Sequence, residues 1–262
     1  MGSLAKEIKS WLCILYMMIK TNTQNTDIVI LCGGLGTRLR PVIGERQKVT
    51  AEVGPKPFLV VLINYIRRFG FSHFVLCTGF AKEEVYNAIQ EQYGNEKQVS
   101  LEFSDEKISL GTGGAIKKAL PLIKSDPFIV VNGDTFSDID FFSLFDFHDR
   151  MKSSLSIVLA RSTREDGGNI IVDKNSRVTS FQEKQNKPTL GYINAGVYMV
   201  SKNVVPSMPA AETFSLEHDF FPEIVKTERC FGYIHKGEML DIGTPERYAY
   251  AEEYFKARGI EV

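Results

Sequence analysis

A glycine-rich turn is the first feature of this sequence with residue types suited to chemistry. It follows a continuous apolar run at 27–32 and reads GGLGTR over residues 33–38. Glycines let the main chain approach a phosphate closely and turn its N–H groups toward the anion. The turn is not a P-loop, which requires Gly-Lys-Ser/Thr, and it lacks the last glycine of a dinucleotide fingerprint, where Leu39 stands. Taken alone, it fits either a phosphate site of another kind or a plain tight turn.

Two cations close to this turn strengthen its interpretation as a phosphate site. Arg38 ends the turn, and Lys48 lies in an irregular stretch at 44–57. Two cations within about ten residues of a glycine turn can neutralise a triphosphate. Considered alone, a lysine in this stretch is better explained as a solvated surface residue.

Two carboxylates form the next candidate constellation. Asp134 ends an apolar strand-like run, and Asp241 follows the apolar pair Met239-Leu240. Ligands of α/β proteins bind where strands give way to loops, and two carboxylates with triphosphate oxygens make a typical Mg²⁺ site. The alternatives are a helix N-cap for Asp134 and a turn residue for Asp241.

The elements that must position these residues alternate between strands and helices up to residue 151. This pattern predicts a doubly wound, mostly parallel α/β sheet with its ligand site at the carboxyl edge. Beyond residue 151 the pattern favours antiparallel strands, with a hairpin turn at 173–176. We expect strands at 27–32, 73–78, 99–103, 128–131, 155–160, 169–172, 178–183, 192–200 and 230–235, and helices at 58–69, 81–93, 113–120, 141–151, 217–225 and 245–257.

Composition limits the class of protein. The chain has 262 residues, 31 Lys plus Arg, 32 Asp plus Glu and a net charge of −1, with 44% hydrophobic residues. This balance excludes a disordered chain and argues against nucleic acid as a partner. No apolar run is long enough for a membrane helix. The four cysteines have no zinc-site spacing, which favours a reducing, cytoplasmic compartment.

Residues 1–26 differ from the rest and are interpreted as an N-terminal extension. Their apolar run at 11–19 is followed by polar linker composition. Three alternatives remain open: an upstream stretch with Met17 or Met18 as the start, an amphipathic helix that docks on the body or on a second subunit, and a cleaved signal peptide. The apolar segment is weakly consistent with a homodimer.

The motifs together resemble those of the sugar-1-phosphate nucleotidyltransferases. The matching segments follow the family's order and lie at 31–41, 48–57, 110–115, 131–134, 181–184, 194–198 and 240–245. Within that family, the segments at 54–59, 110–120 and 132–136 are most similar to those of the D-glycero-α-D-manno-heptose 1-phosphate guanylyltransferases. The resemblance implies a single GT-A-like domain over 27–262, with a nucleotide-binding half at 27–150 and a sugar-binding half at 151–262.

The resemblance also implies a reaction and the residues that perform it. A sugar 1-phosphate attacks the α-phosphorus of a nucleoside triphosphate, and pyrophosphate leaves. Arg38 and Lys48 would be catalytic, and Asp134 and Asp241 would hold Mg²⁺. The nucleotide would contact Leu31, Gly33, Gly34, Gly36, Thr37, Arg38, Thr112, Gly113, Gly114 and Asp134. The sugar phosphate would contact Gly133, Glu183, Lys184, Asn194 and Gly196.

The base and the acceptor are less closely defined. Guanine is favoured by the subgroup resemblance, and Asp105 or Glu106 could accept from its N–H groups. Other acceptors remain open, among them mannose 1-phosphate and N-acetylmuramic acid 1-phosphate. Gln47, Val49 and Glu52 stand where the family commonly has proline, and they motivate a further alternative, a catalytically weakened nucleotide-sensing protein.

Overall fold

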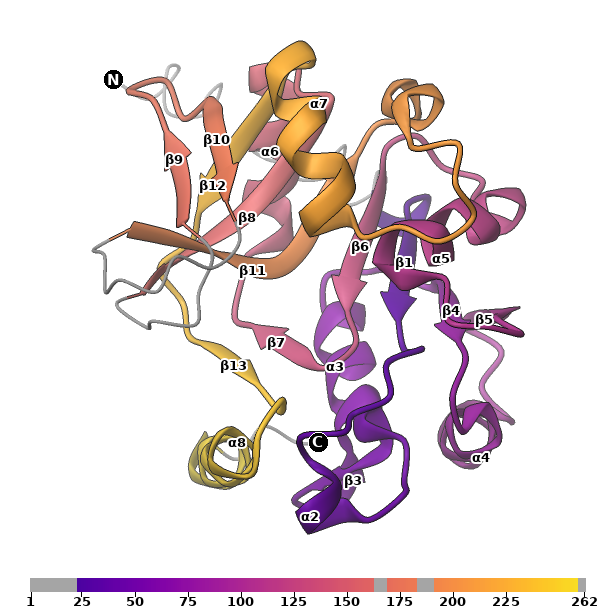
Figure 1. Ribbon diagram of the computed structural model, residues 1–262. Coiled ribbons are helices and arrows are strands. Elements are labelled where there is room, and N and C mark those ends of the chain that lie inside the picture. The colour runs from indigo at the N-terminus through magenta and orange to yellow at the C-terminus, as the bar shows by residue number, and fades with distance from the viewer. Residues whose placement is uncertain (1–22, 163–168, 183–190, 259–262) are drawn as a thin grey trace, which may run out of the picture.

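Four parallel strands form one half of the central sheet, and the glycine-rich turn at 33–38 follows one of them. The computed structural model describes residues 23–162, 169–182 and 191–258. In it the strands lie in the order β6 (Phe128–Asn132), β1 (Asp27–Leu31), β4 (His73–Thr78) and β5 (Ser100–Asp105) (Figure 1). The buried apolar runs of β6, β1 and β4 explain why their continuous patterns were recognisable, whereas β5 is only partly buried. All four carboxyl ends lie at one edge of the sheet.

Antiparallel strands complete the sheet, as the second half of the sequence predicts. β11 (Gly191–Val200) pairs with β6 and with β8 (Leu155–Ser162). Beyond them lie β12 (Cys230–Ile234), parallel to β8, and the hairpin of β9 (Asn169–Val172) and β10 (Val178–Gln182). β11 therefore joins the two halves of the molecule.

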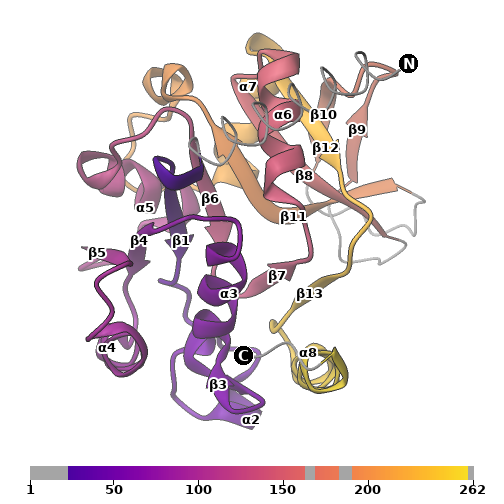
Figure 2. The ribbon, with the colours of Figure 1, turned by 180° about the vertical axis from the view of Figure 1, so that it is seen from behind.

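Helices cover both faces of the sheet, which confirms the doubly wound α/β prediction (Figures 1 and 2). On one face the core contains residues of α3 (Phe58–Arg67), α4 (Lys82–Tyr93), α6 (Phe141–Met151) and α8 (Pro245–Arg258). On the other it contains residues of α5 (Gly111–Ala119) and α7 (Phe221–Thr227). Because these helices pack on the two faces of the sheet, the carboxyl edge of the parallel strands is left for a site.

Several short elements were not expected from the sequence. A two-stranded ribbon pairs β7 (Thr135–Ser137) with β13 (Met239–Asp241), and a second pairs β2 (Glu52–Val53) with β3 (Lys56–Pro57). A short helix, α2 (Arg40–Ile43), follows the glycine turn. The helix expected at 217–225 is divided into a π-helical turn, Leu216–Phe220, and α7, because Pro222 has no N–H for a continuous helical ladder.

The described part of the N-terminal extension packs on the body. Thr23 and Thr26 are both buried, and Thr23 lies against Gly70 at the end of the α3 segment. Residues 1–22 lie outside the described part of the chain. In the described ranges, we find no helix with the length and apolar character needed to span a membrane.

Candidate active site

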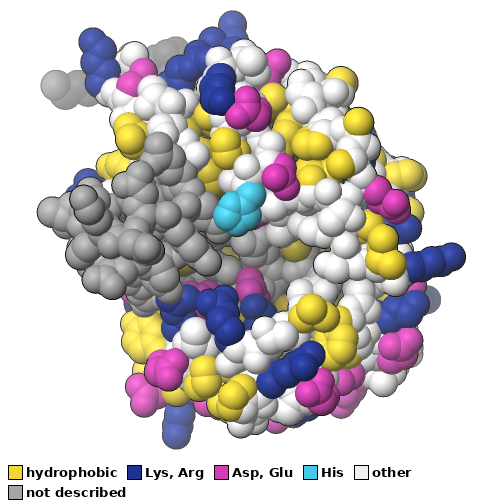
Figure 3. Space-filling model, in the orientation of Figure 1, with side chains coloured by type: hydrophobic (Ala, Val, Ile, Leu, Met, Phe, Trp, Pro, Cys, Tyr) yellow, Lys and Arg dark blue, Asp and Glu magenta, His cyan; other side chains and the backbone are white. Residues whose placement is uncertain are grey.

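A cavity of about 230 Å³ lies at the carboxyl edge of the parallel strands. Figure 3 shows this face of the molecule hollowed near its centre, with Lys and Arg side chains along the lower border of the hollow. The cavity brings together residues from the glycine turn, from the Lys48 segment and from the ends of β1, β5 and β6. Its lining includes Leu31, Gly33, Gly34, Gln47, Lys48, Glu106, Thr112, Asn132 and Asp134.

The glycine turn presents main-chain donors at this cavity. Among the hydrogen bonds of the described residues, none has the N–H of Gly33, Gly34 or Gly36 as its donor. Gly36 has a φ of +59°, and a Cβ there would lie 2.9 Å from the Cβ of Lys48. Glycine is therefore required at 36 for both conformation and space. Unpaired N–H groups on a tight turn are suited to bind phosphate oxygens.

Lys48 and Asp134 form an ion pair inside the cavity. The Lys48 ammonium donates to Oδ2 of Asp134, and the two side chains are 12% and 31% exposed. Burial raises the pKa of Asp134, but the charge and hydrogen bond of Lys48 outweigh it and hold the pKa below its usual range. Asp134 is therefore a carboxylate near neutral pH. The structure thus places two predicted site residues, 86 positions apart in the sequence, in direct contact.

The β7–β13 ribbon brings Asp241 next to Asp134. Asp241 pairs with Thr135 across the ribbon, and the N–H of Ile242 donates to the main-chain oxygen of Asp134 at 3.1 Å. The Asp241 carboxylate lies 3.2 Å from Nη1 of Arg247 at both of its oxygens. The Arg38 guanidinium reaches the same corner, since a Cβ on Gly243 would lie 3.4 Å from its Nη2 and 2.8 Å from Asp241 Oδ1.

This corner has the donor chemistry of a magnesium site. Its two partly exposed carboxylates sit on adjacent backbone segments, and hard oxygen ligands are those that Mg²⁺ prefers. No cluster of three or more His, Cys, Asp or Glu side chains suited to a metal occurs in the described ranges. An ion held here would thus take its remaining ligands from water and substrate phosphates, as Mg²⁺ usually does.

The first turn of α5 has a different geometry from the one expected. The N–H groups of Gly113 and Gly114 both donate to the carbonyl of Phe214, at 3.0 and 3.3 Å. A Cβ on Gly113 would lie 2.1 Å from the Phe214 ring. These two glycines thus permit close packing, and their N–H groups are already used. Thr112 faces the cavity, and its hydroxyl donates to Glu217 at 2.7 Å.

The predicted sugar residues are only partly described. Glu183 and Lys184 lie outside the described ranges. Gly133 donates its N–H to Leu31 at 3.0 Å, and Gly196, with a φ of +71°, lies against Asn132. Asn194 accepts the Gly196 N–H at 2.9 Å and donates to the Tyr198 hydroxyl, which shapes an irregularity in β11. Their contacts with a sugar remain predictions.

The structure separates the two acidic residues considered for base recognition. Glu106 lines the cavity and accepts the N–H of Leu110 at 2.9 Å. Burial raises its pKa above the usual range for a glutamate. Asp105 instead accepts from Thr78, Lys82 and Tyr86 outside the cavity. Only Glu106 is therefore placed to meet a ligand.

Gln47 and Asn132 are cavity residues that the sequence interpretation did not assign to the site. Gln47 is 1% exposed and hydrogen-bonded to the glycine turn. Its φ of −67° lies in the range that proline requires, so glutamine can replace proline here without changing the backbone. The unusual residue beside Lys48 was the available signal for Gln47. For Asn132, whose buried Oδ1 has no partner among the described residues, the one available signal was its position at a strand end.

The fold and the phosphate-type cavity at a strand edge define a nucleotide-binding α/β protein. The chain belongs to the nucleotidyl transferase family, whose sequence pattern matches residues 27–257.

Individual relatives agree with this assignment. The chain is 33% identical to the D-glycero-alpha-D-manno-heptose 1-phosphate guanylyltransferase of Aneurinibacillus thermoaerophilus, over 87% of this chain and 97% of the relative. It is also 33% identical to the mannose-1-phosphate guanylyltransferase of Mycobacterium tuberculosis, over 86% of this chain and 63% of that relative. The crystal structure of HddC from Yersinia pseudotuberculosis complexed with GMP-PN superposes with a TM-score of 0.77 at 33% identity, covering 88% of this chain and 99% of that one.

Proposed function

We propose that this protein transfers a guanylyl group from GTP to D-glycero-α-D-manno-heptose 1-phosphate, giving GDP-heptose and pyrophosphate. The observation that carries the proposal is one cavity lined both by the Lys48–Asp134 pair and by the glycine turn, whose N–H groups have no partner in the described ranges. Two relatives named as guanylyltransferases support guanine as the base. The heptose acceptor rests on the first of them, which the chain matches over almost its full length.

The reaction needs positioning and charge neutralisation more than acid–base chemistry, because a phosphate nucleophile is already ionised. The N–H groups of Gly33, Gly34 and Gly36, with Thr37 and Arg38, hold the β- and γ-phosphates. Lys48 neutralises charge that develops near the α-phosphate. Asp134 and Asp241 hold Mg²⁺, which when bound supplies charge stabilisation to the phosphates.

The acceptor lies toward β11 in this proposal. Asn194, Gly196 and Gly133 border it, with Glu183 for sugar hydroxyls and Lys184 for the phosphate. Leu31, Thr112, Gly113 and Gly114 border the nucleoside. The reaction takes place in the cytoplasm, and its product supplies heptose to capsule, S-layer or lipopolysaccharide glycans.

Pyrophosphate release from each of the four nucleoside triphosphates, paired with several sugar 1-phosphates, tests this proposal. We expect the highest kcat/KM with GTP and the heptose 1-phosphate. A preference for mannose 1-phosphate, as in the mycobacterial relative's name, or for N-acetylmuramic acid 1-phosphate would replace the acceptor. Tight GTP binding without release from any pair would contradict the enzyme and support a nucleotide sensor.

A further inference from the structure

We propose that Gln47 is a positioning residue that holds the glycine turn in its phosphate-binding conformation before any ligand arrives. The inference rests on the proposed function, since it assigns the donors for the triphosphate. It concerns a residue that is itself 1% exposed. Gln47 acts through the main chain of the turn and through Lys48, its neighbour in sequence.

The side-chain amide of Gln47 donates to three main-chain carbonyls. Its Nε2 lies 2.6 Å from the oxygen of Cys32, 3.2 Å from that of Gly34 and 3.0 Å from that of Phe80. Because carbonyl oxygens only accept, the neighbours fix which side of the amide carries the hydrogens. One buried side chain therefore ties the turn after β1 to the turn after β4.

These contacts determine where the N–H groups of the turn point. In a planar trans peptide the C=O and the following N–H point in opposite directions. With the carbonyls of Cys32 and Gly34 directed at Gln47, the N–H groups of Gly33 and Leu35 are directed away from it. Neither of these N–H groups donates to any residue in the described ranges. The amide thus leaves two donors available for phosphate oxygens.

The main chain of Gln47 also fixes Lys48. Its N–H donates to Oε2 of Glu84 at 2.9 Å, and its carbonyl accepts the N–H and hydroxyl of Thr50 at 3.0 and 2.8 Å. These bonds begin the 3₁₀ turn Lys48–Thr50, from which the ammonium reaches Asp134. A single residue therefore sets both the turn and the lysine, so that neither must be ordered during the reaction.

Gln47→Met tests the assignment, because methionine keeps the length and volume but removes the donor. Calorimetric titrations use three probes: GTP, inorganic tripolyphosphate and guanosine, which has no phosphate. We expect the affinity for GTP and tripolyphosphate to fall about tenfold or more, the equivalent of one or two hydrogen bonds, and the affinity for guanosine to stay unchanged. Gln47→Asn keeps the amide on a shorter side chain, so its affinity for GTP and tripolyphosphate should lie between those of the wild type and of Gln47→Met. This variant tests the assignment if the methionine variant does not fold.

Tyr86→Phe is the matched control, because it removes a polar contact of the same helix, α4, with Asp105 outside the cavity and leaves every contact of Gln47 in place. It should keep the wild-type affinity for tripolyphosphate. An equal loss of guanosine and GTP binding in Gln47→Met would reveal a merely structural role, and unchanged GTP binding would equally overturn the inference. If tripolyphosphate binding depends on Gln47 but the wild-type protein releases no pyrophosphate from any substrate pair, only the proposed reaction is contradicted.

Discussion

At the scale of single residues, Glu106 is an acidic side chain that lines the cavity, and under the proposed function it would accept the N–H groups of guanine. A glutamate accepts two N–H groups of guanine only when it is ionised. Burial raises its pKa, so protonation removes this acceptor at a higher pH than for an exposed glutamate. We therefore expect the KM for GTP to rise as the pH is lowered through that raised pKa. Glu106→Gln should abolish this pH dependence and lower the preference for GTP over ATP about tenfold or more.

Asp105→Asn provides the control for that experiment. Asp105 is the neighbouring acid, but its carboxylate is bonded to Lys82, Tyr86 and Thr78. Steady-state kinetics with GTP and ATP between pH 5 and pH 8 should give wild-type ratios for this variant. If Asp105→Asn lowered the preference for GTP over ATP and Glu106→Gln did not, the placement of the base beside Glu106 would be wrong.

The sequence could indicate which residues carry chemistry but not which way they face. Lys48 and Asp134 were predicted from their types and positions, and they meet in the structure. Asp105 and Glu106 could not be distinguished, since neighbours on a strand end point to opposite sides. No local pattern could indicate that Phe214 packs against Gly113 and Gly114, because the two segments are distant in the sequence.

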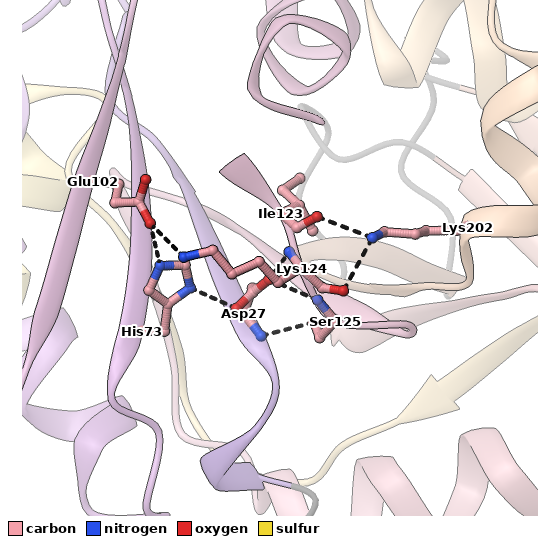
Figure 4. A network of polar contacts seen from close by, with 7 residues as sticks. All are labelled: Asp27, His73, Glu102, Ile123, Lys124, Ser125 and Lys202. Carbon is pink, nitrogen blue, oxygen red and sulfur yellow. Dashed lines mark hydrogen bonds and ion pairs between the residues drawn. The ribbon is translucent and has the colours of Figure 1, made fainter. Parts of the chain in front are cut away.

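At the scale of elements, a polar network ties the strands together at the edge opposite the cavity. His73 of β4 lies between Asp27 of β1, at 2.5 Å, and Glu102 of β5, at 2.8 Å (Figure 4). Asp27 also accepts the N–H groups of Lys124 and Ser125. Since β1 separates this network from the cavity, we infer that it stabilises the sheet and takes no part in the reaction.

Asp27→Ala should therefore lower the free energy of unfolding without changing the KM for GTP. It leaves buried donors unpaired, and breaking such a buried set costs about 3 kcal/mol. Urea denaturation measures the loss, and kinetics well below the transition measure KM. Lys124→Ala is the control: it removes an ion pair whose lysine is 72% exposed, and such pairs contribute at most about 1 kcal/mol. A raised KM with unchanged stability would contradict this assignment.

Element boundaries were predictable where one pattern was long and regular. The expected strand at 73–78 and helix at 141–151 have the same ends as β4 and α6, because a buried apolar run and an amphipathic period each extend over their full length. β7 and β13 have only three residues each. Pairing between segments so short depends on the tertiary contacts of the strands around them, so the sequence had no local signal for them.

At the scale of the whole molecule, the β7–β13 ribbon brings together two carboxylates that are far apart in the sequence. Asp134 directly precedes β7, and Asp241 ends β13, which pairs with β7. If both carboxylates hold the same Mg²⁺, removing either should remove most of what the ion contributes. Their effects on catalysis should then overlap and not multiply, as is usual for residues that act as a unit.

A double-mutant cycle measures this coupling. We expect Asp134→Asn and Asp241→Asn each to lower kcat/KM by about 100-fold or more, since several kcal/mol of charge stabilisation are lost. The double variant should be no worse than roughly the more damaging single one. Asp138→Asn is the control acid, since Asp138 follows β7 but is bonded to Tyr65 and Arg258; its effect should multiply with that of Asp134→Asn. If the effects of Asp134→Asn and Asp241→Asn on kcat/KM multiply over a range of Mg²⁺ concentrations, the two aspartates serve separate purposes. The β7–β13 ribbon would then have no role in assembling a metal site.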